Sequence, residues 1–286
     1  DRFRQLQQSL VHARTLAGMR FGRTFRLGLP VAATLVLASL AAACGDSSSD
    51  DDGDGGGGAG SGTLATGPGA GPGSGSGAGT SLGDCPIFPA DNAWNVDIRD
   101  LPVRPESDTW VDAIGRDDTL HADFGTEYEG APIGIPYVVV SGSQAKVDVE
   151  FTDYPEESDP GPYPIPPDAP VEGGPSGDGD RHVIVIDGDN CTLYEMFYAY
   201  PRDSDDGWSA ACGAVFDLKT NDEHPLGWTS ADAAGLPIFP GLVRYEEIEA
   251  GEITHAIRMT ASGTQRAFVP PARHFAGDDD PSLPPM

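Results

Sequence analysis

Basic residues are scarce in this chain of 286 residues. Its 17 Lys and Arg stand against 45 Asp and Glu, which gives a formal net charge of −28. Six of the 17 basic residues but only one acid precede Cys44, so the remainder carries 11 basic and 44 acidic groups, a charge of −33. Nucleic-acid affinity comes largely from Lys and Arg that neutralise phosphates. The scarcity therefore excludes nucleic acid as a partner, and the acidity favours solubility, cation binding or a halophilic or marine setting.

The sequence also lacks the short motifs of several common chemistries. It contains no metalloprotease motif, P-loop or dinucleotide-binding fingerprint, and its GSGSG stretch is low-complexity sequence. Its four cysteines include no Cys-x-x-Cys pair, so a zinc or redox site has no support. No reaction is identified by these patterns alone.

No apolar run is long enough to be a typical membrane span. Residues 27–43 form a run of 17 residues without a charge, whereas a transmembrane helix needs about 20 apolar residues. Three arginines and no acid lie between Met19 and this run. A basic stretch followed by an apolar stretch and small residues predicts a signal peptide over 19–43, with a permanent span as the alternative.

A cysteine stands at the border between apolar and hydrophilic sequence. The small residues before Cys44 resemble a bacterial lipobox, with Ala41 where leucine is usual. We therefore predict an exported cell-envelope protein, lipidated at Cys44 and held to the membrane by that anchor. An ordinary signal peptide cut after an alanine is the alternative. Residues 1–18, ahead of Met19, are interpreted as upstream sequence translated by mistake.

The composition divides the exported part into a linker and a domain. Residues 44–83 consist almost entirely of Gly, Ser, Ala, Asp, Thr and Pro after Cys44, and cannot bury a core. Residues 84–286 are enough for one domain with a hydrophobic core.

Short strand-like segments dominate this domain, each rich in β-branched or aromatic residues and bounded by Gly, Pro, Asn or Asp. Short helices are expected at 106–115, with Ser107 as N-cap, at 230–235, capped by Ser230, and at 243–251. Seven or more short strands predict a mainly β fold, a β-sandwich or jelly-roll-like single domain. The strand segments are 134–142, 145–151, 181–188, 191–200, 212–220, 252–260 and 265–270.

The strand register predicts how the cysteines pair. Strands at about 192–200 and 210–218 should form a hairpin, which places Cys191 opposite roughly residue 219 and several residues away from Cys212. Disulfide geometry does not span that separation. We therefore expect a Cys85–Cys191 disulfide and a buried thiol at Cys212.

The domain contains the long ordered stretch WTSADAAGLPIFPGLVRYEEIEAGEITHAIRMT, together with ESDPGPYPIP, GDRHVIVID, LYE and PARH. In these motifs residues 85–286 resemble a family of exported bacterial proteins without an assigned activity. The resemblance implies no mechanism. Similar proteins continue past SLPPM into further strand-like sequence, so the resemblance implies a domain truncated at its C-terminus.

A long Pro-rich loop over 153–180 is a candidate for function, because loops of this length within a domain are usually functional or disordered. It either covers the sheet or lines a ligand groove. At its end, Asp178 and Asp180 are a candidate calcium site, because carboxylates one residue apart can chelate that ion. Arg181 and His182 follow as candidate ligand-binding residues, although a core position is the simpler interpretation of His182.

Glu195 is the most notable carboxylate, because it shares a strand face with Leu193 and Phe197. A carboxylate among apolar groups has a raised pKa, as a general acid requires. We expect it partly buried at the floor of a cleft, where it could act with Asp232 and His255. The alternatives are an ion pair with Arg181 or Arg244, or an edge position facing water.

The remaining candidates follow the last core strands. Trp228 and Arg244 lie in a loop fixed by Gly and Pro that suits a sugar surface, and Arg273 and His274 could grip an anion. A hydrolase triad of Ser230, Asp232 and His255 is not favoured, because no Gly-x-Ser-x-Gly motif is present.

Two functional hypotheses follow. The first is a non-catalytic, lipid-anchored module that binds extracellular glycan or a cell-surface protein. The second is a polysaccharide-active hydrolase or lyase that uses paired carboxylates, the minimum for glycoside hydrolysis. No cofactor is expected other than the candidate calcium ion.

Overall fold

The computed structural model describes residues 81–286 apart from 122–123, 126, 129–130, 204–206 and 262. The predicted signal peptide, Cys44 and nearly all of the linker lie outside the described residues.

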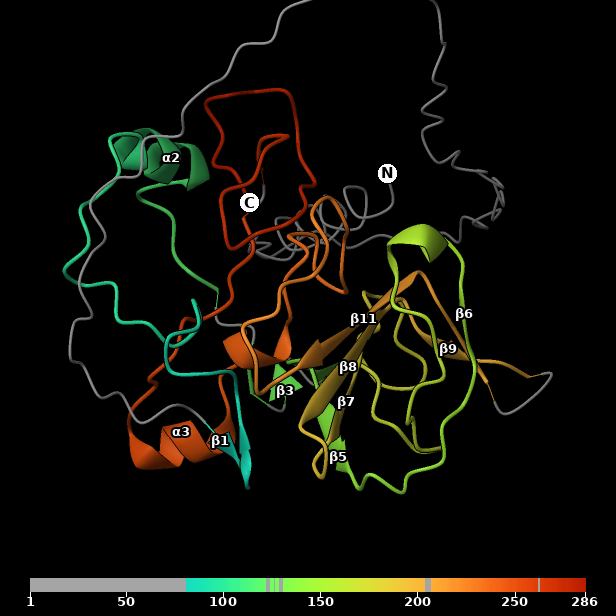
Figure 1. Cartoon of the computed structure of the whole chain (residues 1–286). Helices are drawn as coiled ribbons and strands as arrows, with labels where there is room; N and C mark the ends of the chain where they lie inside the picture. The colour runs from blue at the N-terminus through green and yellow to red at the C-terminus, as the bar shows by residue number, and fades with distance from the viewer. Residues whose placement is uncertain (1–80, 122–123, 126, 129–130, 204–206, 262) are drawn as a thin grey trace, which may run out of the picture.

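The centre of the domain is a four-stranded sheet in the order β11 (Cys212–Asp217), β8 (Thr192–Phe197), β7 (Val183–Asp187) and β5 (Tyr137–Val140) (Figure 1). β5 runs parallel to β7, and the other neighbours are antiparallel. All five residues of β7 are buried. A strand that is apolar on both sides must be covered on both faces of its sheet.

One face is covered by a second sheet of three strands, β6 (Val149–Phe151), β10 (Trp208–Ala210) and β9 (Tyr200–Pro201). Trp208 and Ala210 pack there against Val183, Val185 and Met196 of the central sheet. The two packed sheets make the fold a mainly β, sandwich-like single domain, as the sequence predicts.

The opposite face of the central sheet is covered by irregular segments. Ile87 and Phe88 from the N-terminal side, and Ile238 and Phe239 from a later loop, form a cluster with the β7 and β8 side chains of that face. Phe239 begins the 3-10 turn η2 (Phe239–Gly241). Much of the core is therefore built from loop residues, and this has consequences for the buried polar groups described below.

The remaining elements are short. β1 (Ser81–Leu82) pairs with β2 (Cys85–Pro86), and β3 (Glu127–Tyr128) pairs with β4 (Ala131–Pro132). The others are α2 (Ser107–Ile114), the 3-10 turn η1 (Pro155–Glu157) and α3 (Tyr245–Ala250). Among the described residues no helix has the length and apolar character needed to cross a membrane.

The predicted helix ends are partly correct. Gly115 and Gly251 terminate α2 and α3 at φ values of 118° and 74°, which glycine adopts more readily than other residues. The predicted N-cap of α2 is wrong, because Glu106 holds that position and Ser107 is the first helical residue. The segment 230–235 forms turns rather than a helix, and the Ser230 hydroxyl donates to the Leu236 carbonyl at 2.6 Å.

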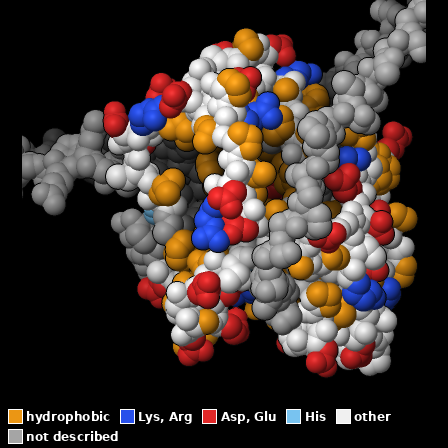
Figure 2. All heavy atoms as spheres, turned by 60° about the vertical axis from the view of Figure 1, so that its left-hand side comes forward, with side chains coloured by type: hydrophobic (Ala, Val, Ile, Leu, Met, Phe, Trp, Pro, Cys, Tyr) orange, Lys and Arg blue, Asp and Glu red, His pale blue; other side chains and the backbone are white. Residues whose placement is uncertain are grey.

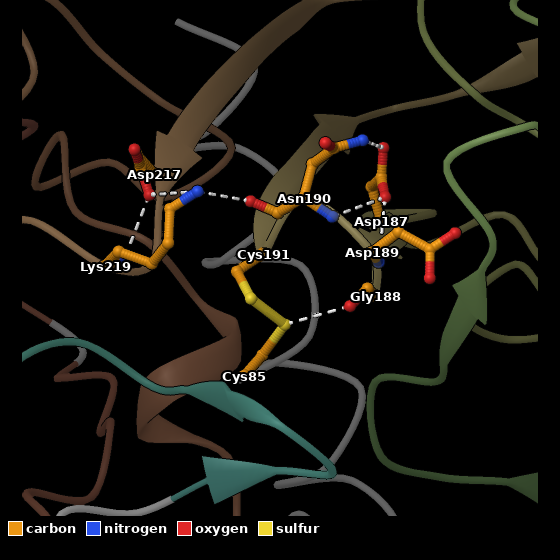
Figure 3. Close-up of a disulfide and its surroundings, with 8 residues drawn as sticks. All are labelled: Cys85, Asp187, Gly188, Asp189, Asn190, Cys191, Asp217 and Lys219. Atoms are coloured by element: carbon orange, nitrogen blue, oxygen red, sulfur yellow. Dashed lines mark hydrogen bonds and ion pairs between the residues drawn. A yellow bond between two sulfur atoms is a disulfide. The ribbon is translucent and has the colours of Figure 1, made fainter.

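Figure 3 shows the predicted disulfide between Cys85 and Cys191, which joins the start of the domain to the turn between β7 and β8. Asp187 stabilises this turn by accepting hydrogen bonds from the N–H of Asp189 (3.1 Å) and of Asn190 (3.0 Å). The register places Cys212 opposite Phe197, far from Cys191 along the hairpin. Cys212 is a buried free thiol, so the predicted pairing is confirmed.

Two of the predicted strands are wrong. Residues 252–260 and 265–270 contain no strand, and the only ladder contact there is an isolated bridge from Gln265 to Asp278. Ile257 and Met259 are 54% and 62% exposed, so the alternation does not mark a face buried in a sheet. Instead Arg258 donates its N–H to the Gly241 carbonyl at 2.9 Å, a contact with a loop rather than with a strand.

Candidate functional site

The described residues enclose a groove of about 770 Å³. Its wall is built mainly from proline, glycine, aliphatic and aromatic residues. On the face drawn in Figure 2, hydrophobic side chains gather around a hollow, and acidic side chains lie between and around them. The groove is lined by Phe124, Gly125, residues 133–137, 167–171 and 173–175, Arg181, Pro201, Trp208, Leu242 and Val243.

The Pro-rich loop both covers the sheet and lines this groove. Tyr163 and Ile165, 0% and 2% exposed, pack into the core between the two sheets. Beyond them, residues 167–175 leave the core and form one wall of the groove. The first part of the loop therefore covers the sheet, and the second part lines the groove.

Arg181 lies at the wall of the groove and is only 2% exposed. Its Nε donates to the Ala199 carbonyl at 3.1 Å, and Nη1 donates to Gly177 at 2.7 Å, with Gly174 and Pro175 each 3.3 Å away. The guanidinium also stacks over Tyr200, 4.1 Å from the ring centroid. Backbone carbonyls and one aromatic ring thus hold the cation in place.

A smaller cavity of about 220 Å³ lies beside the loop 221–224. His224 contributes to its wall, with Nε2 3.1 Å from Asp159 Oδ2, and its Nδ1 has no hydrogen-bond partner among the described residues. Arg273, on the same wall, pairs with Glu223 at 2.7 Å and donates Nε to the His224 carbonyl at 3.0 Å. His224 Nδ1 is enclosed, so nothing entering this cavity reaches it without movement of the wall.

Glu195 is more deeply buried than the sequence indicates. It does share a face with Leu193 and Phe197, but it is 0% exposed and lines neither cavity. Its Oε1 accepts the N–H of Phe239 at 2.8 Å, and Oε2 accepts the N–H of Ile238 at 2.8 Å. The predicted position at a cleft floor is wrong, because the loop that carries η2 covers this carboxylate completely.

The electrostatics of Glu195 follow from this position. Burial raises its pKa to about 7, although the N–H groups of Ile238 and Phe239 oppose the shift by favouring the ionised form. Neither arginine proposed as its partner, Arg181 or Arg244, makes an ion pair with it in the described structure. The carboxylate accepts hydrogen bonds from the backbone N–H groups at the start of η2.

The other two candidate catalytic residues are each paired with a different group. Asp232 accepts a hydrogen bond from Arg258 Nε at 2.6 Å. His255 Nε2 lies 2.9 Å from Glu247 Oε1 but outside hydrogen-bond geometry. Glu195, Asp232 and His255 therefore do not converge on a common open space.

His182 is a buried histidine held between two acceptors. Its Nδ1 lies 2.6 Å from Glu172 Oε2 and its Nε2 lies 3.1 Å from the Ala231 carbonyl oxygen. Burial lowers the pKa of His182, but the hydrogen bond and the charge of Glu172, with that of Asp180, raise it above its ordinary value. Because both ring nitrogens face acceptors, the imidazolium form fits this site best. The position agrees with a structural role.

The remaining candidate ligand-binding residues hold loops. Arg244 forms the N-cap of α3, pairs with Glu247 and lies over the Phe239 ring. Trp228 packs edge-on against His224, with ring centroids 5.5 Å apart. His274 Nδ1 lies 2.9 Å from the Ala233 carbonyl oxygen. Of the predicted ligand-binding residues, Arg181 lines the groove and Arg273 lines the smaller cavity.

The two candidate calcium ligands, Asp178 and Asp180, differ in exposure. Asp178 is exposed and Asp180 is half-buried, and burial raises the pKa of Asp180. Within the described ranges, no three His, Cys, Asp or Glu side chains are grouped to hold a metal ion. A calcium site here would have to rely on backbone oxygens and water.

Comparison with models of known families, with curated proteins and with solved structures returns no match to this chain. The resemblance to a family of exported proteins therefore stays a prediction, and the site is interpreted from its own geometry.

Sequence patterns did not indicate three residues that line the groove, Phe124, Tyr137 and Trp208. Each lies outside the Pro-rich loop in the sequence and lines the same groove only in the folded structure. The one usable signal was the loop itself, whose unusual length and proline content marked it as a candidate wall.

Proposed function

We propose that this protein is an exported, lipid-anchored module that binds extracellular glycan in the groove. The observation that carries the proposal is the groove of about 770 Å³ with its proline, glycine and aromatic lining. Sites for small ligands are concave, mostly apolar and about 300–1,000 Å³ in volume, whereas protein partners usually cover about 800 Å² of surface. A concave site of this size suits a short oligosaccharide as its ligand better than it suits a protein partner.

Binding is better supported than catalysis. Glycoside hydrolysis by paired carboxylates needs two of them about 5–10 Å apart on either side of the scissile bond. Glu195 is enclosed and Asp232 pairs with Arg258, and neither lines the groove. The polysaccharide-active enzyme is therefore not proposed.

Export and anchoring are inferred from the sequence before the domain. The signal-like stretch and Cys44 predict both, and the Cys85–Cys191 disulfide suits an oxidising compartment. The Gly- and Ser-rich linker would then hold the groove away from the membrane.

The experiment is a glycan-array screen of residues 84–286, followed by titration of the best oligosaccharide. Phe124→Ala removes a half-exposed aromatic ring from the groove and should weaken binding roughly two- to twelvefold, the loss expected for one ring contact of about 0.5–1.5 kcal/mol. Tyr245→Ala removes a ring outside the groove that is 70% exposed, against 48% for Phe124, and should bind as the wild type does. An array without any binder, or equal losses in the two variants, would refute the proposal.

A further inference from the structure

Arg181 differs in its partners from the other buried or half-buried arginines of the domain core. Arg244, Arg258 and Arg273 each form an ion pair with a carboxylate. Arg181 is buried at least as deeply, and no carboxylate of the described residues pairs with it. A buried charge is costly to the folded state unless it is paired or fully hydrogen-bonded.

The hydrogen bonds of Arg181 leave one end of the guanidinium free. Nε and Nη1 donate to backbone carbonyls, and within the described part of the chain Nη2 has no acceptor. Nη2 is not among the fully enclosed side-chain atoms that lack a partner, so some of its surface is open. Arg181 is also one of the residues that line the groove, the space where a ligand would lie.

The backbone of Arg181 supports a specific role for this side chain. Its φ of 51° lies in the left-handed region, which is unfavourable for residues with a side chain such as arginine. Such strain persists only where the surroundings fix it, and it clusters at ligand sites. Four carbonyl groups and the Tyr200 ring fix it here.

We infer that the groove recognises an anionic sugar unit, whose carboxylate or sulfate group accepts hydrogen bonds from Nη2 of Arg181. This inference rests on the proposed glycan-binding function and names the ligand class for the same site. Guanidinium groups bind such anions with short, charge-assisted hydrogen bonds. The pairing would supply the counter-charge that the described structure does not provide.

The many acidic residues elsewhere in the chain do not prevent an anionic ligand from binding in the groove. Exposed charges farther away than about 8 Å are largely screened at physiological ionic strength. Among the residues that line the groove, only Asp168 is acidic, and it is exposed at the surface. Arg181 is the one basic residue among those that line the groove.

The test compares matched ligands on the wild-type domain. Calorimetric titration with oligogalacturonate should give an affinity at least tenfold higher than its methyl ester, which has the same sugar backbone without the charge. A sulfated oligosaccharide and its desulfated form are the second pair, and a preference confined to one pair identifies the anion. Equal affinity within both pairs overturns the inference but leaves glycan binding intact, whereas no binding to any glycan refutes both.

Variants then assign the preference to one residue. In Arg181→Met, the affinities for the charged and the uncharged ligand should differ by less than threefold. Arg181→Lys should keep part of the preference for the charged ligand. Arg273→Met, an arginine variant outside the groove, should keep all of it. Thermal melts verify folding, and if Arg181→Met does not fold, the wild-type ligand comparison still decides. A preference that survives in folded Arg181→Met overturns the inference.

Discussion

At the scale of single residues, the central finding concerns Glu195. The strand face on which it lies could be predicted from the alternation with Leu193 and Phe197, but its complete burial could not. The loop that covers it is forty residues farther along the chain, and the bond to the Ile238 N–H exists only after that loop has folded over β8. A carboxylate that looks like a general acid in the sequence is therefore an acceptor for buried backbone groups.

Glu195→Gln tests this assignment. The amide hydrogens would face the N–H groups of Ile238 and Phe239, whereas a carboxylic acid can turn its single hydrogen away. We expect the variant to fold, with the free energy of unfolding at pH 5 lowered by about 1–3 kcal/mol, since an amide NH2 group replaces the oxygen that accepts the shorter of the two Ile238 N–H hydrogen bonds. The melting temperature should fall by roughly 2–4 °C per kcal/mol. Glycan binding should not change, because Glu195 does not line the groove.

The difference in the free energy of unfolding between the wild type and Glu195→Gln should become smaller as the pH rises. Burial raises the pKa of Glu195 from 4.5 to about 7, so its contribution is fully present below about pH 4.5 and is lost as the pH rises through 7. At about 1.4 kcal/mol per unit, the advantage of the wild type should shrink by on the order of 3 kcal/mol between pH 4.5 and 8. Denaturant unfolding of both proteins across this range measures it. A wild-type advantage that grows with pH would contradict the assignment.

At the scale of elements, the disulfide makes a direct prediction. Peptide mapping without reduction should link Cys85 to Cys191 and find Cys212 as a free thiol. Replacing both bonded cysteines by serine opens a loop with a sequence separation of 106, which should lower the free energy of unfolding by about 4–5 kcal/mol. Cys212→Ser serves as the control that keeps the bond. A crosslink between Cys191 and Cys212 would show that the strand register is wrong.

The elements also show what the sequence can and cannot predict. The pairing of β8 with β11 and the disulfide were predictable, because alternation marks both strands and the connection over 198–211 limits their register. Residues 252–260 alternate just as clearly, yet no partner strand lies beside them, and Arg258 turns inward to Asp232 instead. Periodicity reports an extended backbone, but not whether another strand will pair with it.

At the scale of the whole molecule, the groove depends on segments distant in sequence. Phe124, Ala169 and Trp208 meet there only because the two sheets pack and the Pro-rich loop spans their edge. Arg181 could be selected from the sequence as a candidate ligand-binding residue, but its unpaired guanidinium could not, since its carbonyl partners come from two separate segments. The site is thus a product of tertiary packing more than of any motif.

The central claim is that glycan binds in the groove, and backbone amide NMR of residues 84–286 tests it most directly. Titration with the best oligosaccharide should shift the amide signals of Gly134, Ala169 and Gly173, which line the groove, and leave those of Asn92 and Asn221 in the smaller cavity unchanged. Saturable shifts confined to the residues of the smaller cavity, with the groove signals unmoved, would contradict the claim.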